Sequence, residues 1–293
     1  MIVLVANPSS GGGKGGRIMP RAIQALGSLG RAYRVVVTED GSHPQRAARE
    51  AVDAGAEAVV ALGGDGLVSA CANALIGTGV PLAVVPTGAG NDFARRLGLD
   101  HRRPLRSIAL LERGAQREVD TVRVEGAGWT RSYVCVAGAG FDSETNQVAN
   151  RMRYLTGTLK YVVALMRTLR TFEPAEFRVV TDDEDLRLHA MMVAVANAAS
   201  YGGGMMVCPD ARMDDGVLDL CVVGAMSRRS FVAAFPSVYR GTHVTHRDVT
   251  MLRSRKVELE ASRPFDVYAD GERFGPLPVT LTVEPRTLEV IAP

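Results

Sequence analysis

The sequence lacks any run of about 18 uncharged apolar residues, so no segment has the composition of a transmembrane helix. It opens with MIVLVANPSS, which has neither a basic leader nor a small-residue cleavage site, and this argues against a secretory signal. We therefore expect a cytoplasmic protein. Its 293 residues are about the length of two ordinary domains, since single hydrophobic cores stop growing near 250 to 300 residues.

Cysteine is scarce and scattered. Cys71, Cys135, Cys208 and Cys221 lie far apart and form no CxxC pair. This spacing argues against a zinc site and against a disulfide framework. Buried free thiols are the simplest expectation for all four residues.

An excess of charge of one sign is also missing. The 34 basic and 32 acidic residues leave a net charge of +2, too small for a dedicated nucleic-acid binder, so we expect no nucleic-acid partner. Lysine is rare, with only Lys14, Lys160 and Lys256, so most basic residues are arginines. Glycine is abundant instead: 31 of 293 residues is about 11%, against a usual value of about 7%.

The first 120 residues alternate between strand-like and helix-like segments. Short apolar runs at 2–6, 33–38, 58–62 and 81–85 are separated by stretches of helical spacing at 18–29, 44–54 and 67–76. This alternation predicts a parallel sheet with helices on both faces.

Beyond residue 120 the pattern changes to strands, several with period-two alternation. Strands are predicted at 121–124, 131–137, 175–181, 186–196, 217–223, 256–260, 265–269 and 279–283. Two helical stretches, near 143–171 and 227–240, interrupt them. The second half is therefore predicted to be mostly β.

Three glycine-rich turns, at 7–14, 63–66 and 86–92, follow the predicted first, third and fourth strands. In an open parallel sheet these strand ends lie along one edge, where ligands bind. Glycine lets backbone N–H groups approach an anion, and each turn leads into a helix N-terminus, whose dipole favours negative charge. Glycine in one such loop is explained equally well by a tight turn, but three loops together indicate a phosphate site.

The two common phosphate-binding motifs do not fit. A Walker A motif needs a glycine and a Ser or Thr where Pro8 and Gly15 stand, and a dinucleotide fold needs an acidic residue where Thr38 ends the second strand. Asp65, Asp92 and Asp120 accompany the glycines. Carboxylates beside phosphates are expected where Mg²⁺ lies between them, although Asp in a glycine turn is also common for local hydrogen bonding.

Five motifs occur in the order Asn7-Pro8-Ser9-Ser10-Gly11, Gly63-Gly64-Asp65-Gly66, Pro86-Thr87-Gly88-x-x-Asn91-Asp92, Gly138-Ala139-Gly140-Phe141-Asp142 and Asp270-Gly271-Glu272. In this order they resemble the bacterial diacylglycerol kinase and lipid kinase family, over nearly the whole chain. The resemblance implies an α/β nucleotide-binding domain at 1–122, similar to NAD kinase and phosphofructokinase. A mostly antiparallel β-sandwich at 123–283 would carry the lipid substrate, and the tail at about 284–293 would return to the first domain.

The resemblance also implies roles for single residues. ATP would be held by Asn7, Pro8, Ser9, Ser10, Gly11, Thr38, Gly63, Gly64, Asp65, Gly66, Leu67, Ser69, Gly88 and Ala89. Asp65, Asp92 and Asp120 would join a network with Mg²⁺ and waters, and Glu272, beside Asp270, would be the general base. For Glu272 a plain hairpin turn is the alternative, since Asp-Gly is itself a hairpin signal.

Residues 208–219 resemble the family's structural Mg²⁺ loop. The ligands would be the Asp215 carboxylate and the carbonyl oxygens of Arg212 and Val217. Without the resemblance, this Asp-Asp-Gly segment between strands would be interpreted as a plain turn.

Three positions depart from the family pattern. Leu67 and Ala89 stand where threonine is usual, and Ser69 stands where asparagine is usual. The loss of three polar side chains is expected to weaken nucleotide contacts or to change nucleotide preference.

Two basic segments suit contact with a membrane surface. Residues 151–171 and 226–247 interleave arginines with aromatic and aliphatic residues, as basic amphipathic helices at anionic membranes do. Packing of each apolar face on the sandwich is an equally good explanation. We expect peripheral association with the inner face of the cell membrane, whereas the oligomeric state, a homodimer included, stays open.

The resulting hypothesis is an ATP- and Mg²⁺-dependent lipid kinase of phospholipid metabolism that converts diacylglycerol to phosphatidic acid. Two alternatives remain: a kinase of a soluble substrate resembling NAD kinase, and a nucleotide-binding regulatory protein without turnover. The acceptor lipid is not distinguished by the sequence.

Overall fold

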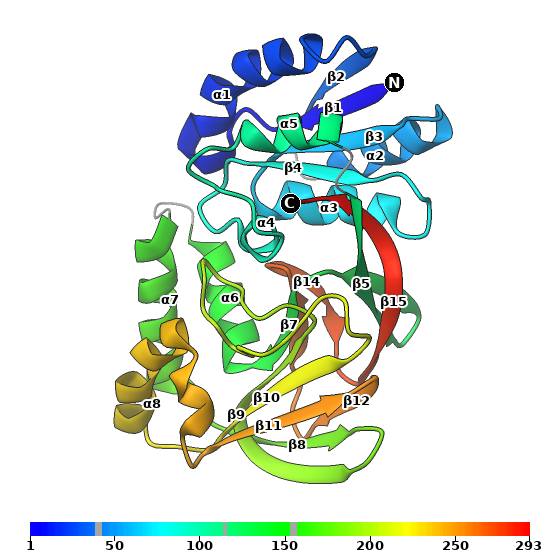
Figure 1. Ribbon diagram of the computed structural model, residues 1–293. Coiled ribbons are helices and arrows are strands. Elements are labelled where there is room, and N and C mark those ends of the chain that lie inside the picture. Colours follow the sequence, from blue (N-terminus) through cyan, green and yellow to red (C-terminus); the bar gives the residue numbers. More distant parts are fainter. Residues whose placement is uncertain (39–42, 114–115, 153–156) are drawn as a thin grey trace. The chain divides into compact units, whose positions relative to one another are not determined.

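The computed structural model describes residues 1–38, 43–113, 116–152 and 157–293, which form two compact units (Figure 1). Unit 1 comprises Met1–Thr121 and Pro285–Pro293, and unit 2 comprises Val122–Glu284. Two strands, β5 (Gln116–Gly126) and β15 (Val279–Ile291), continue from one unit into the other. No helix among the described residues is long and apolar enough to cross a bilayer.

Unit 1 contains a parallel sheet in the order β2-β1-β3-β4. Its strands are β1 (Ile2–Ala6), β2 (Tyr33–Val37), β3 (Ala58–Gly63) and β4 (Leu82–Pro86). Every residue of β1, β3 and β4 is buried, as expected for short apolar runs covered on both faces. At its far edge β4 pairs in parallel with the end of β15, where Val290 lies opposite Leu82.

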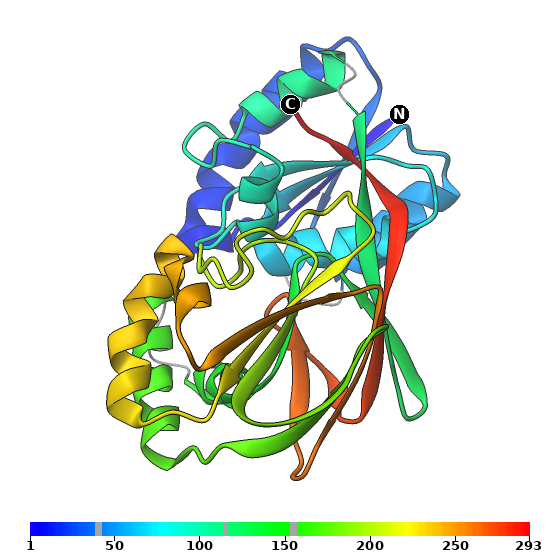
Figure 2. The same ribbon diagram turned by 60° about the horizontal axis from the view of Figure 1, so that its bottom comes forward.

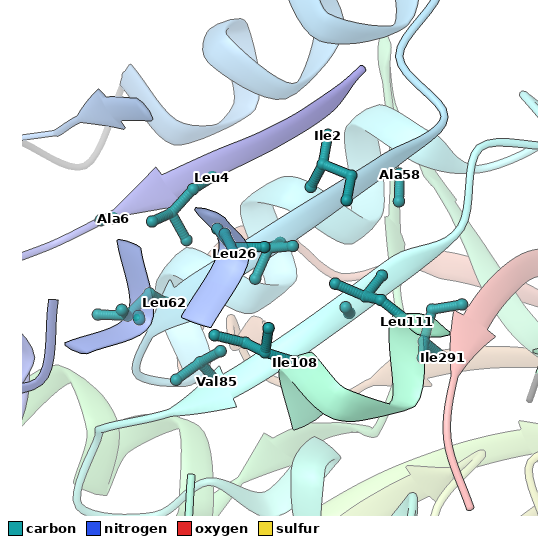
Figure 3. Packing of buried hydrophobic residues seen from close by; sticks show 13 residues of the cluster. Ile2, Leu4, Ala6, Leu26, Ala58, Leu62, Val85, Ile108, Leu111 and Ile291 are labelled. Atoms are coloured by element: carbon teal, nitrogen blue, oxygen red, sulfur yellow. The ribbon is translucent and has the colours of Figure 1, made fainter. Parts of the chain in front are cut away.

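Helices cover both faces of this sheet (Figure 1). On one face lie α1 (Ser10–Gly27) and α5 (Arg106–Arg113), and on the other lie α2 (His43–Asp53) and α3 (Asp65–Leu75). Leu26 of α1 and Ile108 of α5 pack onto Leu4 and Leu62 of the sheet in one buried cluster (Figure 3). The burial of such large side chains, each contributing roughly 1.5 to 3 kcal/mol, fixes the helices on the sheet.

The path of the chain creates a switch point between β1 and β3. After β1 the chain turns to the face of α1, and after β3 it turns to the opposite face with α3. The loops that follow these neighbouring strands therefore diverge at the carboxyl edge of the sheet. Such a switch point is where open α/β sheets bind ligands.

Unit 2 is mostly antiparallel, which confirms the fold class predicted for the second half. Its sheet runs in the order β14-β13-β7-β9-β8-β12-β15, with β10 and β11 branching from β9 and β6 pairing with β5. The strands not yet bounded are β6 (Trp129–Tyr133), β7 (Val136–Gly140), β8 (Ala175–Val180), β9 (Asp185–Ala196), β10 (Leu218–Gly224), β11 (Val249–Ser254), β12 (Lys256–Ala261), β13 (Asp266–Ala269) and β14 (Glu272–Pro276).

The helices of unit 2 lie at one end of these strands (Figure 2). They are α6 (Phe141–Arg151), α7 (Gly157–Thr171), α8 (Arg228–Ala234) and the short 3-10 helices η1 (Phe235–Arg240) and η2 (Thr242–Thr245). Phe141 of α6 packs edge to face on Phe231 of α8, with ring centroids 4.7 Å apart, which joins the helices into one layer.

Several expectations need correction. The strand expected at 131–137 is two strands, because the N–H groups of Val134, Cys135 and Val136 bond to the Asp270 carboxylate. The helix expected at 18–29 already begins at Ser10 and ends at Gly27, although Gly11 to Gly13 have non-helical dihedrals. The stretch at 227–240 is a short α-helix followed by a 3-10 helix, and β11 and β14 were not predicted.

The four cysteines are buried free thiols, as predicted. Burial raises the pKa of Cys71 and of Cys221 to about 12, so neither thiol ionises near neutral pH.

Candidate functional site

The three glycine loops of unit 1 come together at the carboxyl edge of its sheet. Asn7 donates its N–H to the carbonyl oxygen of Leu62 at 3.0 Å, and Thr87 donates its N–H to that of Gly63 at 2.9 Å. The hydroxyls of Ser10 and Thr87 lie 2.6 Å apart. The loops after β1, β3 and β4 therefore form a single hydrogen-bonded cluster.

Some of the glycines are required by this packing. A Cβ on Gly88 would lie 2.5 Å from the Cα of Gly64, and a Cβ on Gly11 would lie 1.9 Å from the carbonyl oxygen of Thr87. Both distances are too short for any other residue, so these glycines allow two loops to touch. Tight packing, which was the alternative to phosphate binding, thus accounts for Gly11, Gly64 and Gly88.

Gly66 is different. It lies exposed in the first turn of α3, its φ is ordinary, and a Cβ at this position would meet nothing within 4 Å. Since glycine in a helix costs roughly 0.5 to 1 kcal/mol relative to alanine, the fold gains nothing from it here. Open space in front of a helix N-terminus is what a close anionic ligand requires.

Asp65 ties the second loop to the third. Its two carboxylate oxygens accept the N–H groups of Asn91 at 2.8 Å and Asp92 at 2.7 Å. These N–H groups open the short helix α4 (Asp92–Arg96), and Asp65 itself lies in the first turn of α3. The carboxylate therefore has a structural task in addition to any contact with a ligand.

Asn91 carries an unsatisfied oxygen in this cluster. Its backbone is left-handed (φ 53°), and its side-chain nitrogen donates to the carbonyl oxygen of Gly88 at 2.7 Å. Its Oδ1 atom is buried, and among the described residues no donor reaches it. A buried acceptor without a partner costs about 1 to 3 kcal/mol, which a bound donor or cation would remove.

The other residues assigned to ATP contact the loops less directly. Thr38, at the end of β2, is buried, and its hydroxyl donates to the carbonyl oxygen of Ala6 at 3.2 Å. Leu67 and Ser69 are buried in α3, whereas Ala89 is exposed. Of the three departures from the family pattern, only Ala89 thus changes the exposed rim of the loops.

Asp120 is fully buried in β5 and accepts the N–H of Arg286 at 2.8 Å. Arg286 has a left-handed backbone (φ 55°), and the carboxylate stabilises this local bend in β15. The hydrogen bond shown for Asp120 thus runs to β15 and not to the glycine loops.

Asp270 and Glu272 occupy a hairpin of unit 2 between β13 and β14. Asp270 has a left-handed backbone (φ 50°), and its carboxylate accepts the N–H groups of Val134 at 2.9 Å and Cys135 at 3.0 Å. Glu272 is exposed and accepts a hydrogen bond from Arg131 at 3.0 Å. Asp270 thus anchors the hairpin, and Glu272 presents an exposed carboxylate that pairs with the Arg131 guanidinium.

The residues assigned to the structural Mg²⁺ loop lie near the start of β10. Asp215 accepts the N–H of Val217 at 3.2 Å and forms an ion pair with Arg253 at 2.6 Å. Arg212 pairs with Asp214 at 3.3 Å. Among the residues that the structure describes, no three acidic, histidine or cysteine side chains come together as metal ligands.

The sequence reasoning missed the contributions of Thr87, Asn91, Arg131 and Arg253 to these sites. Thr87 and Asn91 belong to the third glycine-rich motif, which does not by itself indicate their individual contacts. Arg131 is 141 residues from Glu272 in the chain, and no local pattern marks it or Arg253.

Comparison with known proteins agrees with this arrangement. Residues 1–124 match the diacylglycerol kinase catalytic domain family, and residues 135–292 match the YegS C-terminal NAD kinase beta sandwich-like domain. A protein of Mycobacterium tuberculosis (strain ATCC 25618 / H37Rv) named diacylglycerol kinase is 34% identical over 294 residues, covering 100% of this chain and 95% of that protein.

Two solved structures share the fold. A diacylglycerol kinase from Bacillus anthracis has a TM-score of 0.77 at 18% identity, covering 100% of this chain and 96% of its own. An NAD kinase from Archaeoglobus fulgidus in complex with ATP has a TM-score of 0.57 at 13% identity, covering 99% of this chain and 93% of its own. With the family matches and the M. tuberculosis relative, the motifs and the two units show that the chain belongs to the bacterial diacylglycerol kinase and lipid kinase family.

Proposed function

We propose that the protein is an ATP- and Mg²⁺-dependent kinase that phosphorylates the free hydroxyl of diacylglycerol, giving phosphatidic acid. Membership of the family supports phosphoryl transfer to a lipid. The choice of ATP rests on the glycine loops of unit 1. The choice of a lipid acceptor rests on the match to the diacylglycerol kinase catalytic domain family, which supports the proposal most strongly, and an apolar cavity of about 80 Å³ in unit 2 is consistent with it.

The nucleotide would lie against the glycine loops. The N-terminal turn of α3 offers N–H groups and the positive end of a helix dipole, and Gly66 leaves that end uncovered. Ser9 and Gly11 are exposed beside it at the start of α1. These groups would hold the phosphates, and unit 1 would be the nucleotide-binding domain.

The donor atoms in this cluster fit a magnesium–nucleotide complex. Asp65 and Asp92 supply carboxylate oxygens, which are hard ligands of the kind Mg²⁺ prefers, and the orphaned Asn91 Oδ1 adds a neutral oxygen. Mg²⁺ bound with ATP would neutralise phosphate charge during transfer. Asp65 would keep both of its backbone hydrogen bonds and use its remaining lone pairs for this purpose.

Glu272 would act as general base. As the acceptor hydroxyl oxygen forms its bond to the γ-phosphorus, Glu272 would take the hydroxyl proton, and the bond from phosphorus to the β,γ-bridging oxygen would break to release ADP. Positioned carboxylates of this kind contribute roughly 10² to 10⁴ in rate. The exposed position of Glu272 on a hairpin leaves it accessible to a substrate.

The cavity under the helices of unit 2 has a volume of about 80 Å³ and would receive the end of one acyl chain, not the whole lipid. Its lining is almost entirely apolar and comes from both the helical layer and the sheet, including Leu165, Met192, Met205, Phe231, Phe235 and Val238. A cavity of this composition excludes a nucleotide or another highly charged acceptor, because burying charge without partners is costly. It therefore favours a lipid over a soluble substrate such as NAD.

The outer surface of the same helical layer would contact the membrane. Val162 and Met166 of α7, Val232 of α8 and Tyr239 of η1 are all between 45% and 48% exposed. Exposed arginines accompany them: Arg167, Arg170, Arg228, Arg229 and Arg240. Apolar side chains among arginines suit an anionic bilayer surface. Arg151 is also exposed, at the end of α6. Residues 153–156 of the predicted segment, and the side chains of 157–161, lie outside the described residues.

An acceptor panel tests the proposal. The purified protein is incubated with labelled ATP and Mg²⁺, together with vesicles containing diacylglycerol, vesicles containing a sphingoid base, NAD, or no acceptor. The expected result is labelled phosphatidic acid with the diacylglycerol vesicles only. Label in NAD would establish the soluble-substrate alternative.

Glu272→Gln is the matched control, because it removes the base while keeping the size of the side chain. We expect this variant to bind ATP as the wild-type protein does and to transfer label at least about 100-fold more slowly. ATP binding by the wild-type protein without transfer to any acceptor would contradict the proposal and support a regulatory role.

A further inference from the structure

The guanidinium of Arg253, on β11, lies against the loop at 208–219. Asp215 uses one carboxylate oxygen to accept the N–H of Val217, and the other lies 2.6 Å from the Arg253 guanidinium. Asp219, at the start of β10, is 5% exposed, and its Oδ1 lies 3.4 Å from the Nε of the same arginine. One guanidinium thus bridges Asp215 and Asp219, two of the four carboxylates in the loop.

Strand register holds Arg253 in this place. Arg253 lies on β11 directly opposite Asp219 on β10, in an antiparallel pair that runs from Leu218 opposite Ser254 to Val223 opposite Val249. Directly opposed residues in such a pair have Cβ atoms about 4.5 to 5.5 Å apart, within reach of an ion pair. The arginine is therefore brought to the loop by the sheet, and its position does not depend on the loop's conformation.

A divalent ion and this guanidinium compete for the same oxygen. Mg²⁺ requires near-octahedral oxygen ligands at about 2.0 to 2.1 Å, and Asp215 would be its one carboxylate ligand in the arrangement implied by the family. With Arg253 on that carboxylate, Mg²⁺ could use the oxygen only by displacing the guanidinium from it. The one carboxylate oxygen assigned to a structural Mg²⁺ is therefore occupied while Arg253 keeps its pairs.

We propose that the Arg253 guanidinium replaces the structural metal ion in this protein, so that unit 2 folds without a divalent cation at the 208–219 loop. Arginine suits this role because its planar donors can bind two carboxylates at once and its charge is permanent.

Thermal unfolding without nucleotide tests the proposal, with the wild-type protein and Arg253→Gln compared in excess EDTA and in excess Mg²⁺. The wild-type protein is expected to unfold at the same temperature in both. Arg253→Gln is expected to lose a few degrees in EDTA and to recover them in Mg²⁺, since the uncompensated carboxylates then bind the ion. Adding Asp215→Asn to Arg253→Gln should abolish the recovery, which localises the ion to this loop.

Metal content provides a second measurement that does not depend on the folding of any variant. The wild-type protein, purified with Mg²⁺ and dialysed without chelator, is expected to contain no stoichiometric Mg²⁺. Three results would overturn the proposal. The wild-type protein could retain one Mg²⁺ per chain, or it could lose stability in EDTA. The third is an Arg253→Gln variant whose stability changes in neither EDTA nor Mg²⁺.

Discussion

The guanidinium of Arg131 lies 3.0 Å from the carboxylate of Glu272 and at the same time 4.4 Å from the centre of the Phe274 ring. Its other terminal nitrogen donates to the carbonyl oxygen of Arg273 at 2.6 Å. The arginine is therefore held by three different contacts on β14, and it fixes the direction in which the proposed base points.

Replacement of Arg131 should affect turnover more than stability. Both side chains of the pair are more than 40% exposed, and surface ion pairs contribute only about 0 to 1 kcal/mol. We therefore expect Arg131→Met to leave the melting temperature nearly unchanged, to lower kcat roughly 10- to 100-fold, and to leave KM for ATP unchanged. Arg131→Lys should restore part of kcat. Equal losses in Arg131→Lys and Arg131→Met would indicate that positioning of Glu272 is not the cause.

Gly66→Ala should separate stability from nucleotide binding. An added methyl group has free space and an ordinary backbone, so the variant is expected to gain up to about 1 kcal/mol of stability. The same methyl group would obstruct the N-terminus of α3, and ATP affinity should fall at least tenfold. Calorimetry and ATP titration measure the two effects.

Gly27→Ala is the matched control for this substitution. Gly27 is an exposed helical glycine with an ordinary φ at the opposite end of α1 from the glycine loop. It should gain similar stability without any change in ATP affinity. Unchanged ATP affinity in Gly66→Ala would argue against nucleotide phosphates at this helix end.

Val232→Glu should weaken binding to vesicles. Val232 is 45% exposed on the α8 surface proposed to meet the membrane, and a carboxylate there would be repelled by anionic lipids. We expect at least a tenfold loss of affinity in vesicle sedimentation. Val37→Glu is the control, because Val37 is also 45% exposed but lies on β2 of unit 1. An equal loss of affinity in both variants, or no loss in either, would show that this surface does not bind the membrane.

His243 should make the stability of the protein sensitive to mild acid. Burial lowers the pKa of His243, and the hydrogen bond of its ring to the Val207 carbonyl oxygen at 3.0 Å only partly opposes this. The unfolded chain therefore takes up the proton first, so the stabilising contribution is complete above about pH 6.5 and is lost as the pH falls towards the folded pKa.

The free energy of unfolding of the wild-type protein and of His243→Gln, compared at pH 7.5 and pH 5.5, measures this contribution. The two pH values lie roughly one unit above and one unit below the pKa of an ordinary histidine. The glutamine amide can still donate to Val207 but does not titrate. We expect the wild-type protein to lose more stability between the two pH values than the variant does. An identical loss in both would assign the acid sensitivity to other groups.

The sheet of unit 1 could be predicted because local and long-range signals coincide there. Buried parallel strands are continuous apolar runs, and each one ends at a glycine turn, so residues 2–6, 58–62 and 81–85 were identifiable one by one. Strand β14 could not be identified, because it contains Gly275 and Pro276, which are rare in strands.

The hydrogen bonds of the site could not be predicted for a different reason. The sequence suggested Asp65 as a metal ligand. Its hydrogen bonds to Asn91 and Asp92, 26 and 27 residues further along the chain, form only because two separate loops meet in the fold. The pairing of Arg253 with Asp219 depends in the same way on strand register. Residue type indicates which chemistry is available, whereas partners are decided by the folded chain.

The most direct test of the central claim is the rate of phosphatidic acid formation from ATP and diacylglycerol vesicles, measured for the wild-type protein and Glu272→Gln. We predict Mg²⁺-dependent formation by the wild-type protein and a loss of at least about 100-fold in the variant, with ATP binding retained. No phosphatidic acid from the wild-type protein, or equal rates from both proteins, would contradict it.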